Sequence, residues 1–366
     1  CVPFAAVAAS VTELEPIIVQ SAYAVPVKAT QTASSVTVLT EKDFAQRNAT
    51  YVSDVLKTVP GVSMISYGGR GALTNFSIRG SEANHTAVII DGVKVNPATG
   101  YGYDFGGLSL SNIERIEVLR GEQSALWGSD AMGGVIYITT KSGLHKDKPF
   151  NLDFDFGTGS HRTRDASITV SGRNDSFYYS VHGDSHRTRG ISAISSNTFH
   201  YTAENGTAFS TGGAVEKDKF HRDNSSVRLG YDVGDKGIEV LASHASQTGH
   251  YDDYSFSNGR FLEINPNSDS YTRTRETLFK LSGYIGSDEE LFKNKLSVSH
   301  VKTDSDTTES NNNSYYDGKK LNTSYQLDVN FDREGDVKQG VSFLTEYQNT
   351  HYDGRSSYAS FQNKKL

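Results

Sequence analysis

At 366 residues the chain is long enough for two or three ordinary domains, and its 20 Tyr, 18 Phe and 34 Gly indicate a β-rich protein with many turns. The formal net charge of -7 and the lack of a basic patch interleaved with aromatic residues argue against a nucleic-acid-binding protein. Cys1 is the only cysteine, so no disulfide can form within the chain.

The chain opens with a short apolar, alanine-rich run that is typical of the end of a secretory signal peptide, with a small-residue cleavage site near Ala9. Residues 1–9 are therefore predicted to be a signal-peptide remnant; a disordered N-terminus and a lipidated Cys1 are the alternatives. Because no Met and no basic segment precede this run, we expect a chain truncated at its start. Residues 10–35 are small, polar and proline-containing, which predicts a flexible tether.

Residues 36–143 mix short strands, helical segments and Gly-rich turns, which predicts a compact α+β domain. A strand is expected at 36–40. Thr40 should then cap a helix, with Asp43 three residues on as an acidic variant of the capping box. Residues 50–59 carry apolar side chains at helical spacing and stop at Pro60-Gly61.

The second half of this domain is predicted to be strand-rich. Asp91-Gly92 lies between the apolar runs 87–90 and 93–95, and this dipeptide is a strong signal for a tight hairpin. Two further strands are expected at 113–119 and 134–138.

From residue 150 onward the sequence alternates apolar and polar residues, as at 166–171, 177–182, 227–233 and 325–331. Alternation of period two fits either a sandwich with a dry core or a barrel with lipid outside. Short connections at 173–175, 234–237 and 334–336 alternate with long polar connections at 187–223, 248–272 and 304–320. Loops sorted by length onto two rims favour a transmembrane β-barrel.

About nine or ten such strands can be counted, and a closed barrel around a domain of this size needs about twice as many. An open sheet edge in lipid leaves backbone groups unpaired at a cost of several kcal/mol each. We therefore expect the antiparallel barrel over 150–366 to be incomplete and the chain to be a fragment. No run of about 18 apolar residues occurs, so no membrane-spanning helix is expected.

Four motifs in order resemble the plug of TonB-dependent outer-membrane receptors across about 100 residues. They are NFSIRG at 75–80, VIIDGV at 88–93, IERIEVLRG at 113–121 and ALWGSDAMGGVIYI at 125–138. The resemblance implies a plug at 36–143 inside a transmembrane β-barrel of a Gram-negative outer membrane. It also implies TonB, with ExbB and ExbD, as periplasmic partners.

The resemblance further implies a charge network between plug and barrel, and the matching side chains are Arg79, Glu114, Arg115, Glu117 and Arg120. Ordinary surface ion pairs are the alternative. It also implies an energy-coupling segment, the TonB box, at Glu15, Pro16, Ile17, Ile18, Val19, Gln20, Ser21 and Ala22. Such a segment would add a strand to its periplasmic partner. Gln20-Ser21 departs from the commoner Val-Thr, and a stray apolar patch in a linker is the alternative.

Within the family, residues 50–62, 68–71, 82–85 and Asn96 resemble the plug of the cobalamin receptors without a gap. That resemblance places cargo on Leu73, Asn75, Glu82, Gly100 and Tyr101. Tyr67 and Tyr103 are added as aromatic residues of the same loops. Ferric siderophore or haem is the alternative cargo within the family.

The same receptors order their outer loops with calcium, which takes six to eight oxygen ligands. Matching residues are Glu216, Asp218, Tyr251, Asp252 and Asp269, with Glu263 as the alternative to Asp269. Ser192 and Ala214 stand where the family has an acid and an amide, which reduces the charge of the cluster. Solvated acidic loops are the alternative.

No enzyme signature is found: the sequence has no nucleophile elbow, P-loop or paired cysteines, so no catalytic residue and no required cofactor are expected. The histidines are scattered singly, without metal-type spacing, at His161, His182, His186, His200, His221 and His244. The predicted function is active uptake of a scarce nutrient. A passive porin-like or adhesin barrel and a soluble, secreted β-rich enzyme are the rivals from other classes.

Overall fold

The computed structural model describes residues 18–19, 27–28, 34–192, 200–202, 208–210, 217–257, 260–309, 313–332, 339–356 and 360–365. The predicted signal remnant at 1–9 lies outside these residues. The described chain forms two main bodies, an α+β domain and a ten-stranded antiparallel sheet. We call the first the plug and the second the wall.

The plug is built on a five-stranded sheet of order β3-β8-β9-β6-β7, in which β6 and β9 are parallel and the other neighbours are antiparallel. A separate hairpin pairs β4 with β5. The elements are β3 Ser35–Thr40, α1 Glu41–Gln46, α2 Val52–Leu56, β4 Val62–Ser66, β5 Thr74–Ile78, β6 Thr86–Ile90, β7 Val93–Lys94, β8 Ile113–Arg120, α3 Ser124–Trp127 and β9 Gly134–Thr140.

Local sequence signals explain the ends of several elements. The backbone N–H and the hydroxyl of Thr40 both donate to Asp43 Oδ2 at 2.9 Å, which confirms the predicted acidic cap of α1. Asp91 and Gly92 have φ of 49° and 81°, and Ile90 pairs with Val93 across them. Positive φ at both central residues is what a two-residue hairpin of this type requires, so the predicted turn is confirmed.

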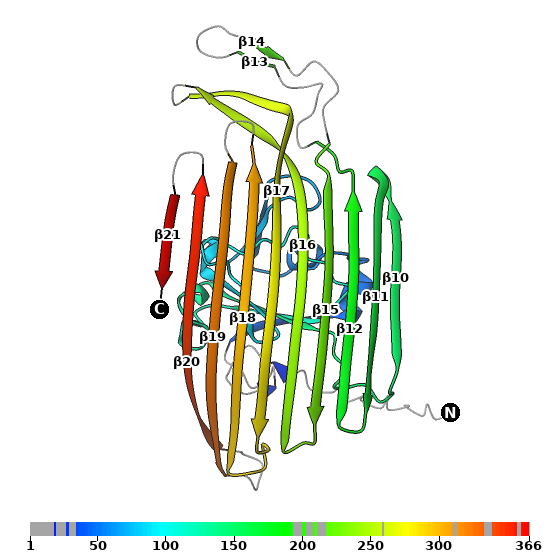
Figure 1. The fold of residues 1–366 in the computed structure, drawn as a ribbon, viewed down its shortest axis with the longest axis vertical. Helices are drawn as coiled ribbons and strands as arrows, with labels where there is room; N and C mark the ends of the chain where they lie inside the picture. Colours follow the sequence, from blue (N-terminus) through cyan, green and yellow to red (C-terminus); the bar gives the residue numbers. More distant parts are fainter. Residues whose placement is uncertain are drawn as a thin grey trace, which may run out of the picture.

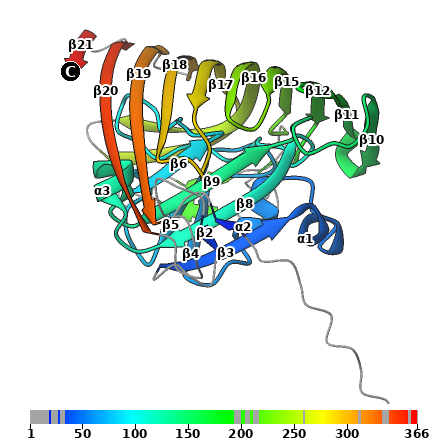
Figure 2. The same ribbon diagram turned by 90° about the horizontal axis from the view of Figure 1, so that it is seen from below.

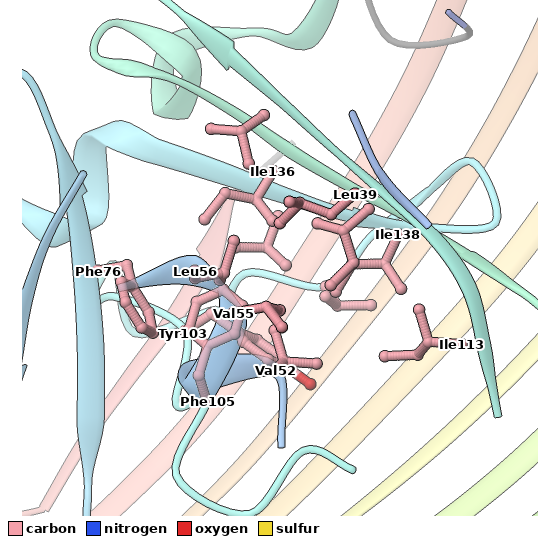
Figure 3. Packing of buried hydrophobic residues seen from close by; sticks show 14 of the residues in the cluster. Leu39, Val52, Val55, Leu56, Phe76, Tyr103, Phe105, Ile113, Ile136 and Ile138 are labelled. Atoms are coloured by element: carbon pink, nitrogen blue, oxygen red, sulfur yellow. The ribbon is translucent and has the colours of Figure 1, made fainter. Parts of the chain in front are cut away.

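The core of the plug lies between its sheet and the two short helices (Figure 3). Val52, Val55 and Leu56 on one face of α2 pack against Ile136 and Ile138 of β9. The apolar spacing at 50–59 therefore has its physical cause in burial of this helix face. Across the same cluster, the rings of Phe76 and Phe105 meet edge to face at a centroid distance of 5.2 Å.

The wall has the strand order β10-β11-β12-β15-β16-β17-β18-β19-β20-β21, with every neighbour antiparallel (Figure 1). This is ten strands, in agreement with the number expected from alternation. The strands are β10 Asn151–Gly159, β11 Thr163–Asn174, β12 Phe177–Thr188, β15 Phe220–Asp232, β16 Lys236–Ser257, β17 Arg260–Ile285, β18 Phe292–Thr308, β19 Asn313–Asp332, β20 Gln339–Ser356 and β21 Ser360–Lys365. A small pair, β13 His200–Thr202 and β14 Ala208–Ser210, lies beyond one end.

Two faces of opposite chemistry decide what kind of sheet the wall is. Along β12 the outward Val181 is 45% exposed, whereas the inward His182 is 3% exposed. The same inversion occurs in β15, where Val227 and Leu229 are exposed and Arg228 is buried. A soluble sandwich buries its apolar face, so this polar-in, apolar-out pattern matches a barrel in lipid.

The predicted sorting of loops holds for the short connections at 173–175 and 234–237 but not for two of the long ones. Residues 248–272 were expected to be a loop, yet β16 runs to Ser257 and β17 starts at Arg260. Residues 304–320 were also expected to be a loop, yet β18 ends at Thr308 and β19 begins at Asn313. Their polar side chains do not prevent backbone pairing, which continues in register between β18 and β19 up to Thr308. The connection at 334–336 lies outside the described residues.

The plug occupies the concave side of the curved wall (Figure 2). Leu241, Leu278 and Val301 project from three adjacent wall strands into the plug core. The two bodies therefore share one apolar cluster. Among the residues that the structure describes, no helix combines the length and the apolar character needed to cross a bilayer.

Gly134→Ala is expected to destabilise the protein far more than Gly80→Ala, although both glycines have positive φ. An added Cβ at Gly134 would lie 2.3 Å from the Leu119 carbonyl oxygen, whereas nothing lies within 4 Å of one at Gly80. We expect Gly134→Ala to lower the free energy of unfolding by about 3 kcal/mol or more, and Gly80→Ala to lower it by about 1 kcal/mol. Denaturant unfolding of the purified protein measures both, and equal losses would contradict this account of the β8–β9 contact.

Candidate functional site

The loops predicted to touch cargo converge on one surface of the plug. The segment between β4 and β5 is closed on itself by a backbone bond from Tyr67 N to Leu73 O at 3.1 Å. The segment after β7 is joined to the start of β5 by a backbone bond from Phe105 N to Thr74 O at 2.8 Å. A Cβ at Gly102 would lie 2.7 Å from Ala83 Cβ, so the loop that carries Glu82 is adjacent. Tyr67, Leu73, Glu82, Gly100 and Tyr101 are all exposed on this surface. We call it the apical surface.

Tyr103 does not belong to that surface, and the prediction is wrong for this residue. Tyr101 is 76% exposed, whereas Tyr103 is 9% exposed and meets Phe105 edge to face at 5.0 Å. The Asn75 amide donates to the Tyr103 carbonyl oxygen at 3.0 Å, so Asn75 fixes this backbone and has a structural part besides its predicted one.

The apical surface is fixed to the wall on one side. An added Cβ at Gly71 would lie 2.0 Å from the Phe220 ring, so only glycine allows the loop to approach β15 so closely. The neighbouring Arg70 lies over the Tyr51 ring, with its guanidinium carbon 4.7 Å from the ring centroid. Its Nη1 lies 3.8 Å from Oδ2 of Asp165 in β11. The predicted cargo contacts at 67–73 therefore border directly on plug–wall contacts.

Three of the five charged residues predicted to link plug and barrel, Arg115, Glu117 and Arg120, have described contacts inside the plug, and the network between plug and barrel stays a prediction. Arg115 Nε lies 3.1 Å from Glu117 Oε1, and Arg120 donates to Thr37 Oγ1 at 2.8 Å and to the Pro60 carbonyl oxygen at 3.0 Å. In the described chain, none of Arg79, Glu114, Arg115 and Arg120 pairs with a charged group of the wall. The physical reason is the strand order: β8 has a plug strand on each side, so its charges find partners there.

The plug–wall ion pair is formed instead at the Asp91-Gly92 hairpin. Arg228 of β15 lies with Nη2 2.7 Å from Asp91 Oδ2 and Nη1 3.2 Å from Glu239 Oε2. Lys280 of β17 donates to the Asp91 carbonyl oxygen at 2.8 Å. The sequence analysis interpreted Asp91 only as a turn residue. The aspartate in VIIDGV was the signal that could have pointed to a carboxylate at the tip of the hairpin, where it can meet a cation of another element.

Asp91 remains charged although it is buried. Burial by itself would raise the pKa of its carboxyl, but the Arg228 guanidinium and two hydrogen bonds from Thr140 outweigh burial and hold that pKa below its usual value. The stabilisation from this depressed pKa is present at neutral pH and is lost as the pH falls through the folded-state pKa.

A second polar connection was not foreseen, because the histidines were judged one at a time. Alternation places His182, Asp184 and His186 on the inner face of β12. Asp184 lies 2.7 Å from His182 Nε2 and 3.2 Å from His186 Nε2, and His186 Nδ1 lies 3.0 Å from Asp165. Ser111 of the plug donates to Asp184 at 3.4 Å. Within the described residues no group of three His, Cys, Asp or Glu side chains is arranged to hold a metal ion.

The predicted coupling segment is described only at Ile18 and Val19. These two residues form β1 (Ile18–Val19), which pairs antiparallel with β2 (Val27–Lys28). Val19 is fully buried in a second apolar cluster with Ile89, Leu119 and Val135 of the plug sheet. Residues 15–17 and 20–22 of the segment lie outside the described chain.

The predicted calcium ligands are described only in part. Asp218 and Asp252 are both buried, and Ser192 donates from its hydroxyl to Asp252 Oδ2 at 3.2 Å. Tyr251 donates to Glu309 at 3.1 Å. Glu216 and the side chain of Asp269 lie outside the described chain, so the cluster itself stays a prediction.

Comparisons with known proteins agree with this architecture. Residues 28–135 match the family model for the TonB-dependent receptor plug domain. A vitamin B12 transporter, BtuB, of Vibrio vulnificus (strain YJ016) is 41% identical over 128 residues, which are 35% of this chain and 21% of that protein. The chain therefore spans about a fifth of the length of this relative.

Solved receptors share the fold at low sequence identity. The ferric preacinetobactin receptor BauA of Acinetobacter baumannii superposes with a TM-score of 0.69 at 15% identity, covering 95% of this chain and 52% of that one. The ferripyoverdine receptor of Pseudomonas aeruginosa gives 0.68 at 16% identity, covering 93% and 45%. At such identities the likeness shows the fold alone.

Arg228→Met is expected to lower the free energy of unfolding by about 3–5 kcal/mol, because it leaves Asp91 and Glu239 buried without their cation. Arg187→Met is the matched control, since its exposed side chain lies 3.9 Å from Asp223, and it should cost at most about 1 kcal/mol. Denaturant unfolding measures both.

Asp91→Asn in the Arg228→Met background should restore part of the loss. Because the pKa of Asp91 is depressed, the difference in the free energy of unfolding between wild type and Arg228→Met should become smaller as the pH is lowered. A difference that does not change with pH would contradict the assignment.

Proposed function

We propose that this chain, as a member of the TonB-dependent receptor family, serves active uptake of a nutrient across the outer membrane of a Gram-negative bacterium. The observation that carries the proposal is the pairing of a plug with the polar inner face of a lipid-facing wall. Such a plug obstructs free diffusion. Cargo would bind first at the apical surface and would pass only after the plug is remodelled. No chemistry on the cargo is proposed.

The proposed energy input reaches the plug through its leader. TonB, with ExbB and ExbD, would supply work from the proton-motive force by pairing with the coupling segment at 15–22 as an added strand. In the structure, part of that segment is already paired and packed within the chain, because β1 pairs with β2 and Val19 is buried. Engagement by TonB therefore requires that Val19 leave its cluster, which costs about 1.5–3 kcal/mol.

Cobalamin or a related corrinoid is the proposed cargo. The support is sequence similarity, because the relative that is 41% identical over 128 residues is a vitamin B12 transporter. A ferric siderophore or haem is the second candidate of the same family, and solved siderophore receptors share the fold without close sequence similarity. The exposed Tyr67 and Tyr101 offer flat apolar contacts that suit either class.

Calcium is proposed only for the long outer loops. Asp218, Asp252 and Ser192 supply oxygen ligands of the right kind, but fewer than the six to eight that calcium takes. The proposed uptake does not depend on it, and no other cofactor is proposed.

Deletion of residues 15–22 is expected to abolish energised uptake while cargo binding persists, because the deletion removes the coupling handle but leaves the apical surface intact. Uptake of radiolabelled cyanocobalamin by cells, with and without an uncoupler, measures this. The control replaces residues 23–26 by a flexible linker of equal length. A passive pore or adhesin, the rival class, would be indifferent to either change.

Purified full-length receptor is expected to bind cyanocobalamin in preference to haem and ferric siderophores. Tyr101→Ala should weaken binding by about tenfold, the loss of one well-packed aromatic contact, whereas Tyr103→Phe should leave it within about twofold because the ring stays in the core. Equilibrium binding titrations decide both points. Preferential binding of a ferric siderophore would transfer the proposal to the second cargo class.

A further inference from the structure

The loop at 67–73, which carries two of the predicted cargo contacts, has an unusually soft backbone. Three of its seven residues are glycine, which has more conformational freedom to lose on ordering than any other residue. Two backbone bonds close the loop on itself, Tyr67 N to Leu73 O and Ala72 N to Gly69 O, both at 3.1 Å. Bonds within the loop fix its shape, but its place on the molecule depends on contacts with other elements.

Arg70, in the middle of this loop, makes such contacts with both bodies at once. Its guanidinium stacks on the ring of Tyr51 and faces Oδ2 of Asp165 in β11. Tyr51 is buried and directly precedes α2, so it belongs to the packed core of the plug. The Tyr51 hydroxyl donates to Oδ1 of the same carboxylate at 3.5 Å. Arg70, Tyr51 and Asp165 therefore form one unit, which we call the Arg70 clamp.

Asp165 is itself held in place by the wall. Its Oδ1 lies 3.0 Å from Nδ1 of His186, and Nε2 of the same ring lies 3.2 Å from Oδ1 of Asp184. Carboxylate oxygens thus face both ring nitrogens, and only a protonated imidazole carries an N–H on each. Asp165 shares the charge of His186 with Asp184, so its second oxygen is left to the Arg70 guanidinium.

The next residue, Gly71, sets how closely the loop approaches the wall. A Cβ at this position would overlap the Phe220 ring, so glycine permits the approach. The missing side chain does not attract the loop to β15, and Arg70 beside it supplies the polar contact that holds the loop there. One residue therefore allows the docked position and its neighbour stabilises it.

We propose that Arg70 is a positioning residue for cargo: the Arg70 clamp holds the loop at 67–73 in one place, so that Tyr67 and Leu73 are presented to cargo already ordered. A loop that is ordered before binding gives a higher affinity, because its ordering no longer opposes binding. The inference rests on the proposed function and adds to it a residue that was not among the predicted cargo contacts. Arg70 acts through the loop and does not need to touch the cargo.

Arg70→Met removes the charge and keeps most of the side-chain length. In the full-length receptor it should raise the Kd for cyanocobalamin about fivefold or more, because an ion pair and a cation–π contact are lost together. Arg70→Lys keeps a cation and should stay within about twofold of the wild type. Arg47→Met is the matched control: it removes a similarly exposed arginine from an ion pair with Asp43 in α1, outside the apical surface, and should also stay within about twofold. Equilibrium binding titrations measure all three.

Asp165→Asn tests the wall side of the clamp. Alone it should raise the Kd about fivefold, and together with Arg70→Met it should again give about fivefold, whereas independent effects would multiply to about 25-fold. Denaturant unfolding should show no larger loss for Arg70→Met than for Arg47→Met, which separates a positioning role from a purely structural one.

The variants are titrated with whichever of cyanocobalamin, haem and a ferric siderophore the wild type binds. An unchanged Kd for Arg70→Met, a Kd for Arg70→Lys as high as that of Arg70→Met, or effects that multiply in the double variant would overturn the inference and leave the proposed function standing. A wild-type receptor that binds none of the three would instead overturn the proposed function.

Discussion

The polar inner face of the wall is the constraint on which the rest of the structure depends. Strands that present apolar side chains to lipid must present alternate residues inward, and here those residues include Arg228, His182 and Lys280. Buried charges need partners, and the plug supplies them as the Asp91 carboxylate and backbone carbonyl. Arg228 therefore shares its charge between Glu239 of the wall and Asp91 of the plug. The shared apolar cluster with Leu241 and Leu278 adds burial to this polar fit.

The plug is held differently on its two sides. Toward the wall it is fixed by a buried ion pair, by the Asp184 connection and by close backbone approach at Gly71. Toward the leader, the contacts within the described residues are those of the two-residue strand β1 with its buried Val19.

The predicted cargo contacts occupy a small part of the molecule. The apical surface exposes Tyr67, Leu73 and Tyr101, and a backbone bond from Phe105 to Thr74 holds two of its segments together. Fold similarity says nothing about these side chains, because receptors for different compounds superpose on this chain at 15% or 16% identity.

The sequence by itself determined what depends on neighbours along the chain. Period-two alternation marked the wall strands, the Asp91-Gly92 pair marked a hairpin that needs positive φ, and Thr40 with Asp43 marked the start of α1. Tertiary structure alone decided which side chains meet. Arg115 and Arg120 of β8 find partners inside the plug, and Asp91, in the turn before the edge strand β7, reaches Arg228 of the wall. Tyr101 and Tyr103 differ in burial, and single histidines join through Asp184, because these outcomes follow from packing between segments far apart in the sequence.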